Sequence, residues 1–353
     1  MAEININPYG QSGQAASGLD IVDNLVEGGR TKALSAEQGK ELNERLEDVE
    51  QTGVVPYFQN APLPRHKDNL KVLIIGNSLY KYGAEYITTI LNELNVAADK
   101  VLIHDAYTSG QSLSTWLNLF ATDGSIQELY SWSKSGSSWS RSYRTDRGIR
   151  SEVADFPWDV IIFQVYPRTG TSGEHADDYS SYKDTVKEFI YEIRKVCPNK
   201  DVAFGFTLIS TNGLTRSGHV DTWSAIVKAT KQLVADTGID IIVPMGTAVI
   251  NAINTNTFKG ENHSYLMCDQ YGHPAQGVSR YITSCVIWES IFAPIFGSMY
   301  GLNQAPTYTA DSSAYANSEI PVTSSNIRLC QQVALAAVSD MWTANTTIDP
   351  IAT

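Results

Sequence analysis

The sequence predicts an α/β protein in which helices cover both faces of a mostly parallel β-sheet. Two observations support this fold class. Short apolar runs typical of buried strands recur along the chain, and segments with a helical spacing of apolar residues separate them. Strands that alternate with helices of this length favour a three-layer α/β/α arrangement. The predicted strands span residues 71–75, 101–105, 158–164, 201–209 and 239–244. The predicted helices span residues 83–95, 178–196, 221–237, 275–294 and 325–343.

The first predicted strand ends in a turn that carries a serine. Lys71-Val-Leu-Ile-Ile75 is a short, apolar, β-branched run, and Gly76-Asn77-Ser78 follows it as a turn signal. A serine on a tight strand-to-helix turn lies where an open α/β sheet builds its site. The alternative is that Ser78 only caps the next helix. Three later segments favour the first interpretation.

These segments follow Ser78 in a fixed order. Tyr107-Thr-Ser-Gly110 comes after the second predicted strand, and the third strand ends on the amide side chain of Gln164. Asp269-Gln-Tyr-Gly-His273 precedes an apolar helix. In order and spacing, residues 69–300 resemble the SGNH (GDSL-like) hydrolases. The likeness is closest to the branch whose first block reads Gly-Asn-Ser and whose third block ends in Leu/Phe-Gln.

The resemblance implies a flavodoxin-like strand order, 2-1-3-4-5, and a serine esterase site. Ser78 is the candidate nucleophile and His273 the candidate base, because a serine hydroxyl needs an imidazole to take its proton. The oxyanion hole would use the backbone N–H groups of Ser78 and Gly110 and the amide of Gln164, which donates without a charge of its own. Glycine at position 110 lets a substrate oxygen approach the backbone.

Asp269 is the candidate partner of the His273 imidazole, with one departure from the family. The family spaces its last block Asp-x-x-His, whereas this chain has Asp-x-x-x-His. Gly272 gives the turn latitude for the carboxylate to reach the ring, and a backbone carbonyl is the alternative orienting group. Two further alternatives stand: His273 as a capping or core histidine, and Gln164 as a strand-end residue satisfied by backbone. Asn77 is expected to hold the turn through an Asx-type bond.

Composition argues against several classes of partner. A net charge of −12 over 353 residues is unfavourable for binding nucleic acid. The chain has neither metal-ligand spacing nor a Gly-rich phosphate loop, so no metal or other cofactor is predicted. A phosphate site at the helix N-terminus after Ser78 is a weak alternative. No apolar run is long enough to span a bilayer, and no signal-peptide pattern is visible. The four cysteines are predicted to be buried free thiols: Cys197, Cys268, Cys285 and Cys330.

Residues 1–53 carry a predicted attachment segment. Ser35-Ala-Glu-Gln38 fits a capping box, and the helix after it places Leu42, Leu46 and Val49 as in a coiled-coil seam. A helix packed on its own domain is the alternative. Residues 54–69, with three prolines, form a predicted linker, and the hydrolase-like domain then spans 70–353.

Residues 18–43 within this segment resemble a short module of bacteriophage tail-fibre and baseplate-associated proteins. The resemblance implies a trimeric attachment element, with other virion tail proteins as partners. The expected location is the phage tail, on a protein made in the cytoplasm of the bacterial host.

An insertion at about residues 125–144 alternates around Ser135-Gly-Ser-Ser138 and predicts a β-hairpin. Its aromatic side chains, among them Trp132 and Trp139, have two interpretations. They form a platform that binds sugar rings, or they make cross-strand packing against the domain, which the pattern favours.

The sequence as a whole predicts a serine esterase on a phage tail appendage. Its expected substrate is an O-acetyl or similar ester on host surface polysaccharide. The main alternative is a virion structural or glycan-binding protein that has a hydrolase-like fold without turnover. A third interpretation is a bacterial carbohydrate esterase from a prophage-rich genome.

Overall fold

The computed structural model describes residues 20–22, 32–34, 69–165, 174–209, 216–237, 239–258, 273–306 and 320–349. The chain divides into two units, Met1–Pro56 and Tyr57–Thr353. In the first unit, strand β1 (Asp20–Val22) pairs in parallel with β2 (Lys32–Leu34). The predicted coiled-coil seam and all but the last residue of the predicted linker lie outside the described residues.

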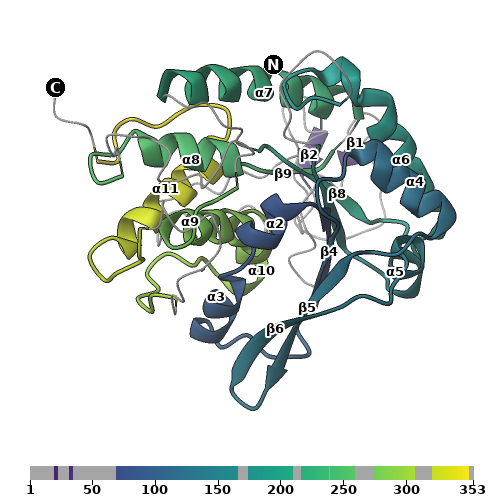
Figure 1. Ribbon diagram of the computed structural model, residues 1–353, viewed down its shortest axis with the longest axis horizontal. Helices are drawn as coiled ribbons and strands as arrows, with labels where there is room; N and C mark the ends of the chain where they lie inside the picture. The colour runs from purple at the N-terminus through teal and green to yellow at the C-terminus, as the bar shows by residue number, and fades with distance from the viewer. Residues whose placement is uncertain are drawn as a thin grey trace, which may run out of the picture. The chain divides into compact units, whose positions relative to one another are not determined.

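The second unit is built on a seven-stranded sheet with the order β6-β5-β4-β3-β7-β8-β9 (Figure 1). When its five parallel strands are numbered in chain order, their spatial order across the sheet is 2-1-3-4-5. This order confirms the fold expected from the sequence. These strands are β3 (Leu70–Gly76), β4 (Val101–Tyr107), β7 (Val160–Phe163), β8 (Ala203–Thr207) and β9 (Ile241–Val243). Every residue of the central strand β3 except Lys71 is buried, because helices cover both faces of the sheet.

The predicted hairpin extends this sheet beyond β4. Strand β5 (Glu128–Ser135) pairs antiparallel with β4 and with β6 (Ser138–Arg144). The turn between them contains Gly136, whose φ of 59° belongs to the left-handed region that glycine adopts readily. The sheet is therefore mixed, with a parallel centre and an antiparallel edge.

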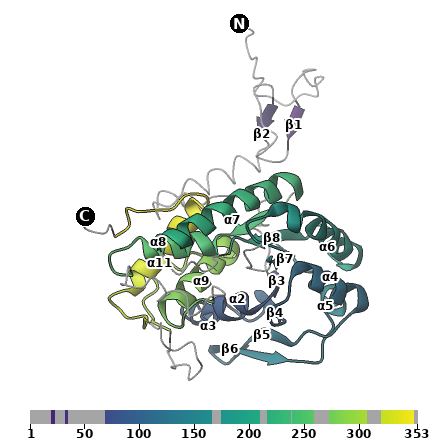
Figure 2. The same cartoon turned by 45° about the horizontal axis from the view of Figure 1, so that its top comes forward.

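The helices form two layers, one on each face of the sheet (Figures 1 and 2). On one face α4, α5 and α6 pack against one another, and on the other α9 packs against α2, α8 and α11. The helices are α2 (Ser78–Gly83), α3 (Ile87–Glu93), α4 (Leu113–Thr122), α5 (Ile149–Asp155), α6 (Lys183–Val196), α7 (Arg216–Thr237), α8 (Met245–Ile253), α9 (Val278–Ile287), α10 (Ala293–Phe296) and α11 (Ile327–Ser339). A short 3-10 helix, η1 (Tyr179–Ser181), precedes α6, and a π-helical turn, η3 (Trp288–Phe292), joins α9 to α10.

Two features of the helices differ from the prediction. The segment predicted as one helix over 83–95 is two helices, and the first of them begins directly at Ser78. Helices α4, α5 and α8 were not predicted. All nine residues of α8 are buried, so its sequence lacks the polar face that marks an amphipathic helix. Within the described residues, no helix is long and apolar enough to cross a membrane.

Candidate active site

The turn after β3 places Ser78 at the N-terminus of a helix and at the carboxyl edge of the central strand. Asn77 caps α2, because its side-chain Oδ1 accepts the backbone N–H of Leu79 at 3.1 Å. Ser78 is then the first helical residue, where backbone N–H groups have no partner within the helix. Asn77, rather than Ser78, is thus the capping residue, and it makes the Asx-type bond expected from the sequence.

His273 reaches Ser78 from a segment 195 residues away in the chain. The Nε2 atom of His273 and the Oγ atom of Ser78 form a hydrogen bond. The imidazole is 9% exposed, and it packs edge to face with the ring of Tyr82, with centroids 5.5 Å apart. Tyr82 lies one helical turn after Ser78 on α2. Asp269 and Gly272 lie outside the described residues, so the role of the Asp269 carboxylate stays a prediction.

Gln164 directly follows β7 and is tied to the same turn. Its Nε2 donates to Asn77 Oδ1 at 2.5 Å. Because that oxygen also accepts from Leu79, the orientation of the Asn77 amide is fixed, and Gln164 has to turn its NH₂ group toward it. An amide NH₂ has two N–H bonds, so one donor remains for a developing oxyanion. The partner of Gln164 is a side chain, which differs from the backbone partner considered above.

The turn after β4 holds Gly110 next to the turn that carries Ser78. The backbone N–H of Thr108 donates to Gly76 O at 3.3 Å, which joins the two turns. Gly110 has a φ of 63°, and a Cβ atom added there would meet no other atom within 4 Å. Glycine is therefore required at this position by the left-handed backbone rather than by crowding.

Two side chains that the sequence did not mark hold the Gly110 turn in place. Gln127 Oε1 accepts the backbone N–H of Ser109 at 3.0 Å. Glu174 accepts the first N–H groups of α4, from Leu113 at 2.9 Å and from Ser114 at 3.2 Å. A carboxylate is favourable at a helix N-terminus, where the helix dipole is positive. No local pattern could reveal Glu174, because its partners lie 61 and 60 residues away.

The hairpin tryptophans require a correction. Trp132 and Trp139 are both buried, so neither presents a ring to a sugar. The indole N–H of Trp139 donates to Val96 O at 2.9 Å, which attaches the hairpin to the segment after α3. The guanidinium of Arg141 lies 4.7 Å from the centre of the Trp132 ring. The packing interpretation describes these residues, and the sugar platform does not.

Arg141 connects the hairpin to the helix that carries Ser78. Its Nη1 donates to Lys81 O on α2 at 2.8 Å, and its Nη2 pairs with Asp105 Oδ2 at 2.8 Å. Asp105 is fully buried, and this burial raises the pKa of its carboxyl to about 6 against the opposing effect of the Arg141 charge. The hairpin therefore supports the site from outside instead of lining it.

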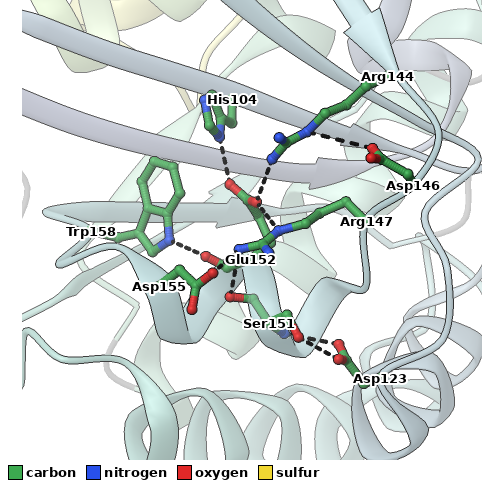
Figure 3. A network of polar contacts seen from close by, with 9 residues as sticks. All are labelled: His104, Asp123, Arg144, Asp146, Arg147, Ser151, Glu152, Asp155 and Trp158. Carbon is green, nitrogen blue, oxygen red and sulfur yellow. Dashed lines mark hydrogen bonds and ion pairs between the residues drawn. The ribbon is translucent and has the colours of Figure 1, made fainter.

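Away from Ser78, a histidine on β4 pairs with a carboxylate on α5 and belongs to a charge network (Figure 3). His104 Nδ1 is 2.5 Å from Glu152 Oε1, and the other oxygen of Glu152 accepts from Arg147 at 2.8 Å. Arg144 contacts the same carboxylate at 3.6 Å. Burial raises the pKa of Glu152, but the bonds and charges of His104 and Arg147 outweigh it and leave the pKa below its ordinary value. The network fixes the chain after β6 to α5, which is a structural task.

In the described residues, the other candidate chemistry would be a metal site or a reactive cysteine or histidine side chain. There, no group of three or more His, Cys, Asp or Glu side chains could hold a metal ion. Cys197, Cys285 and Cys330 are buried free thiols, as predicted, and Cys268 lies outside the described residues. His175 is buried near the start of η1.

The strand order and the Ser78–His273 pair define an α/β protein with a serine and a histidine hydrogen-bonded at the carboxyl edge of its sheet. A family model described as "Domain of unknown function (DUF4886)" matches residues 71–311, and the chain belongs to this family. No curated protein matches the chain.

Three solved structures are similar to the chain to different degrees. A DUF4886 family protein from Bacteroides uniformis is 20% identical, with a TM-score of 0.61 over 79% of this chain and 98% of its own. A lipase/acylhydrolase from Enterococcus faecalis is 10% identical, with a TM-score of 0.38 over 62% of this chain and 93% of its own. A carbohydrate esterase family 2 enzyme with a carbohydrate-binding domain, from Corynascus thermopiles (Myceliophthora fergusii), is 16% identical, with a TM-score of 0.30 over 50% of this chain and 55% of its own. Only the likeness to the Bacteroides protein supports the fold.

Proposed function

We propose that the protein is a serine-dependent ester hydrolase with Ser78 as its nucleophile. The observation that carries the proposal is the hydrogen bond between Ser78 Oγ and His273 Nε2. In the first step the imidazole takes the hydroxyl proton while Oγ bonds to the acyl carbon. The leaving alcohol then receives that proton as its bond to the acyl group breaks. Water then gives a proton to the same imidazole and attacks the acyl carbon. The bond from Oγ to that carbon breaks, the acid leaves, and Oγ takes the proton back.

The surrounding donors suit the negative charge that develops on the acyl oxygen. The N-terminus of α2 supplies the backbone N–H of Ser78, and the neighbouring turn supplies that of Gly110. Gln164, held by Asn77, supplies a neutral side-chain donor. Donors that are fixed before the reaction stabilise an oxyanion without reorganising during it. Asp269 remains the proposed orienting carboxylate for His273.

The finer proposal is that the ester is a small acyl group, most simply acetyl, on a host surface polysaccharide. It is supported by the resemblance of the sequence blocks to SGNH hydrolases and by the tail-fibre-like module at residues 18–43. We propose likewise that residues 1–53 attach the protein to other virion tail proteins as a trimer. The resemblance of this module and the seam of Leu42, Leu46 and Val49 support that assignment.

The test is hydrolysis of p-nitrophenyl acetate by the purified full chain. We expect Ser78→Ala to lower the rate by about 10³-fold or more, while Ser133→Ala, at an exposed position on β5, leaves it unchanged. A fluorophosphonate probe should label the wild type and not Ser78→Ala. A wild-type protein that neither hydrolyses the ester nor takes the label would overturn the proposal and favour a glycan-binding protein without turnover.

A further inference from the structure

Helix α9 contains a buried arginine, Arg280, to which the proposed reaction assigns no step. All ten of its residues are buried, and the one charged side chain among them, Arg280, is 3% exposed. A guanidinium removed from water is unfavourable unless it is paired and hydrogen-bonded. The contacts that Arg280 makes therefore indicate why an arginine is placed there.

Each contact of Arg280 is with a residue next to His273 or on or beside α2, the helix of Ser78. Nε donates to Pro274 O at 3.2 Å, and Pro274 is the residue after His273. Nη1 pairs with Glu85 Oε2 at 2.5 Å, just beyond the end of α2. The guanidinium carbon lies 4.4 Å from the centre of the Tyr82 ring, which itself packs against the His273 imidazole. One side chain thus contacts the backbone beside the base and the helix that carries the nucleophile.

Helix α9 is also joined to the last residue of α2, Gly83. Ser284 Oγ donates to Gly83 O at 2.7 Å, and Thr283 Oγ1 donates to the same carbonyl at 3.2 Å. These two bonds fix the helices to each other, whereas the bond from Arg280 to Pro274 O fixes the segment of His273 to both. The base and the nucleophile come from distant parts of the chain, so their alignment depends on links of this kind.

We infer that Arg280 is a positioning residue that holds the His273 imidazole against Ser78 through Pro274 O and the Tyr82 ring. The inference rests on the proposed hydrolase function. Arginine suits the task because its planar fork donates in two directions while its face stacks on an aromatic ring. Lysine, a point charge on a flexible stem, cannot make these contacts together.

The first test compares Arg280→Met and Arg280→Lys in the full chain with p-nitrophenyl acetate. Misplacement of the base by about 1 Å is expected to lower kcat by about 10²-fold, with little change in KM. Arg280→Lys should be nearly as slow as Arg280→Met, because lysine keeps the positive charge but lacks the planar guanidinium that donates in two directions. Recovery of the wild-type kcat in Arg280→Lys would overturn the inference and leave Arg280 as a charge partner of Glu85.

The matched control is Arg328→Met. Arg328 also lies over a tyrosine ring, 4.6 Å from the centre of Tyr300, and donates to Gln331 Oε1 at 3.2 Å on α11. Arg328 is less buried than Arg280, so Arg328→Met controls for loss of an arginine–tyrosine ring contact and should not lower kcat. If Arg280→Met does not fold, Tyr82→Leu removes the ring between Arg280 and His273 and should lower kcat by at least about 10-fold. Unchanged kcat in a folded Tyr82→Leu or Arg280→Met overturns the inference.

A second readout does not depend on turnover. The ¹⁵N imidazole spectrum of His273 reports whether Nε2 is hydrogen-bonded to Ser78. We expect Ser78→Ala to shift this signal, and Arg280→Met to shift it in the same direction. If the wild type hydrolyses no ester, the proposed function fails, but the spectrum still tests the positioning role. A His273 signal that is the same in Arg280→Met as in the wild type overturns it.

Discussion

The amide of Gln164 donates to the side-chain oxygen of Asn77, and through it the end of β7 is tied to the turn that presents Ser78. The same oxygen caps α2 through the N–H of Leu79. One atom of Asn77 thus fixes the start of α2, which carries the proposed nucleophile, and the orientation of Gln164, the proposed oxyanion donor. Stability and chemistry should therefore respond separately to changes at these positions.

Substitutions of Asn77 can separate the effect on stability from the effect on catalysis. Asn77→Ala removes the cap and the acceptor of Gln164, so we expect the free energy of unfolding to fall by about 1–2 kcal/mol. Asn77→Asp keeps an acceptor for both donors and should retain the stability. Its negative charge lies beside the developing oxyanion and should lower kcat. Urea denaturation and ester hydrolysis measure the two properties, and an Asn77→Asp variant as active as the wild type would contradict the argument.

Gln164 should matter to the transition state more than to substrate binding. Gln164→Ala removes the proposed side-chain oxyanion donor, and we expect kcat for a small ester to fall by about 10²-fold or more with little change in KM. Gln164→Glu should be at least as slow, because its carboxylate repels the oxyanion and faces Asn77 Oδ1. Steady-state kinetics of both variants measure kcat and KM separately. A change confined to KM would show that Gln164 binds the substrate without stabilising the transition state.

Gly110 and Gly136 form a matched pair for testing the Gly110 turn. Their φ angles are 63° and 59°, and an added Cβ atom meets nothing within 4 Å at either position. Alanine should therefore lower the free energy of unfolding by about 1 kcal/mol at both, through backbone strain alone. Only Gly110→Ala should also lower kcat, because relief of the backbone strain would displace an N–H that belongs to the candidate oxyanion hole. Equal activity in the two variants would remove Gly110 from the site.

Stability should depend on pH through Glu289. This carboxylate accepts from Ser298 Oγ at 2.8 Å and from the N–H of Met299 at 2.6 Å, and burial raises its pKa from 4.5 to about 7 despite these bonds. Between these values the folded protein holds a proton that the unfolded chain has released. The free energy of unfolding therefore falls as the pH rises from 4.5 to 7, and the loss is complete above that range.

Glu289→Gln tests this dependence, because an amide keeps an acceptor oxygen but carries no charge. We expect the variant to match the wild type near pH 4.5 and to be more stable by on the order of 2 kcal/mol at about pH 8. Glu192→Gln, in a surface pair with Lys195, is the control and should show no such gain. Thermal unfolding across this pH range measures both, and a gain that does not vary with pH would contradict the assignment.

The sequence predicted the parts of the fold and site that depend on local patterns. The turn at Ser78 and the hairpin around Gly136 each follow from a few neighbouring residues. The contacts of Glu174 and Arg280 join segments far apart in the chain, so no local pattern marks them. Alternation in the hairpin predicted a shared aromatic face but not what covers it. The structure shows that Trp139 is covered by the segment around Val96.

Assembly of the chain should depend on its N-terminal segment. If Leu42, Leu46 and Val49 form a seam between chains, the full chain should be a trimer in light scattering. Replacing Leu42 and Leu46 together by lysine places charges in that seam and should dissociate it. Hydrolysis of a small ester should not change, since Ser78 and His273 lie outside this segment. If the double variant keeps the mass of the wild type, the chains associate through residues 54–353 and the seam has another role.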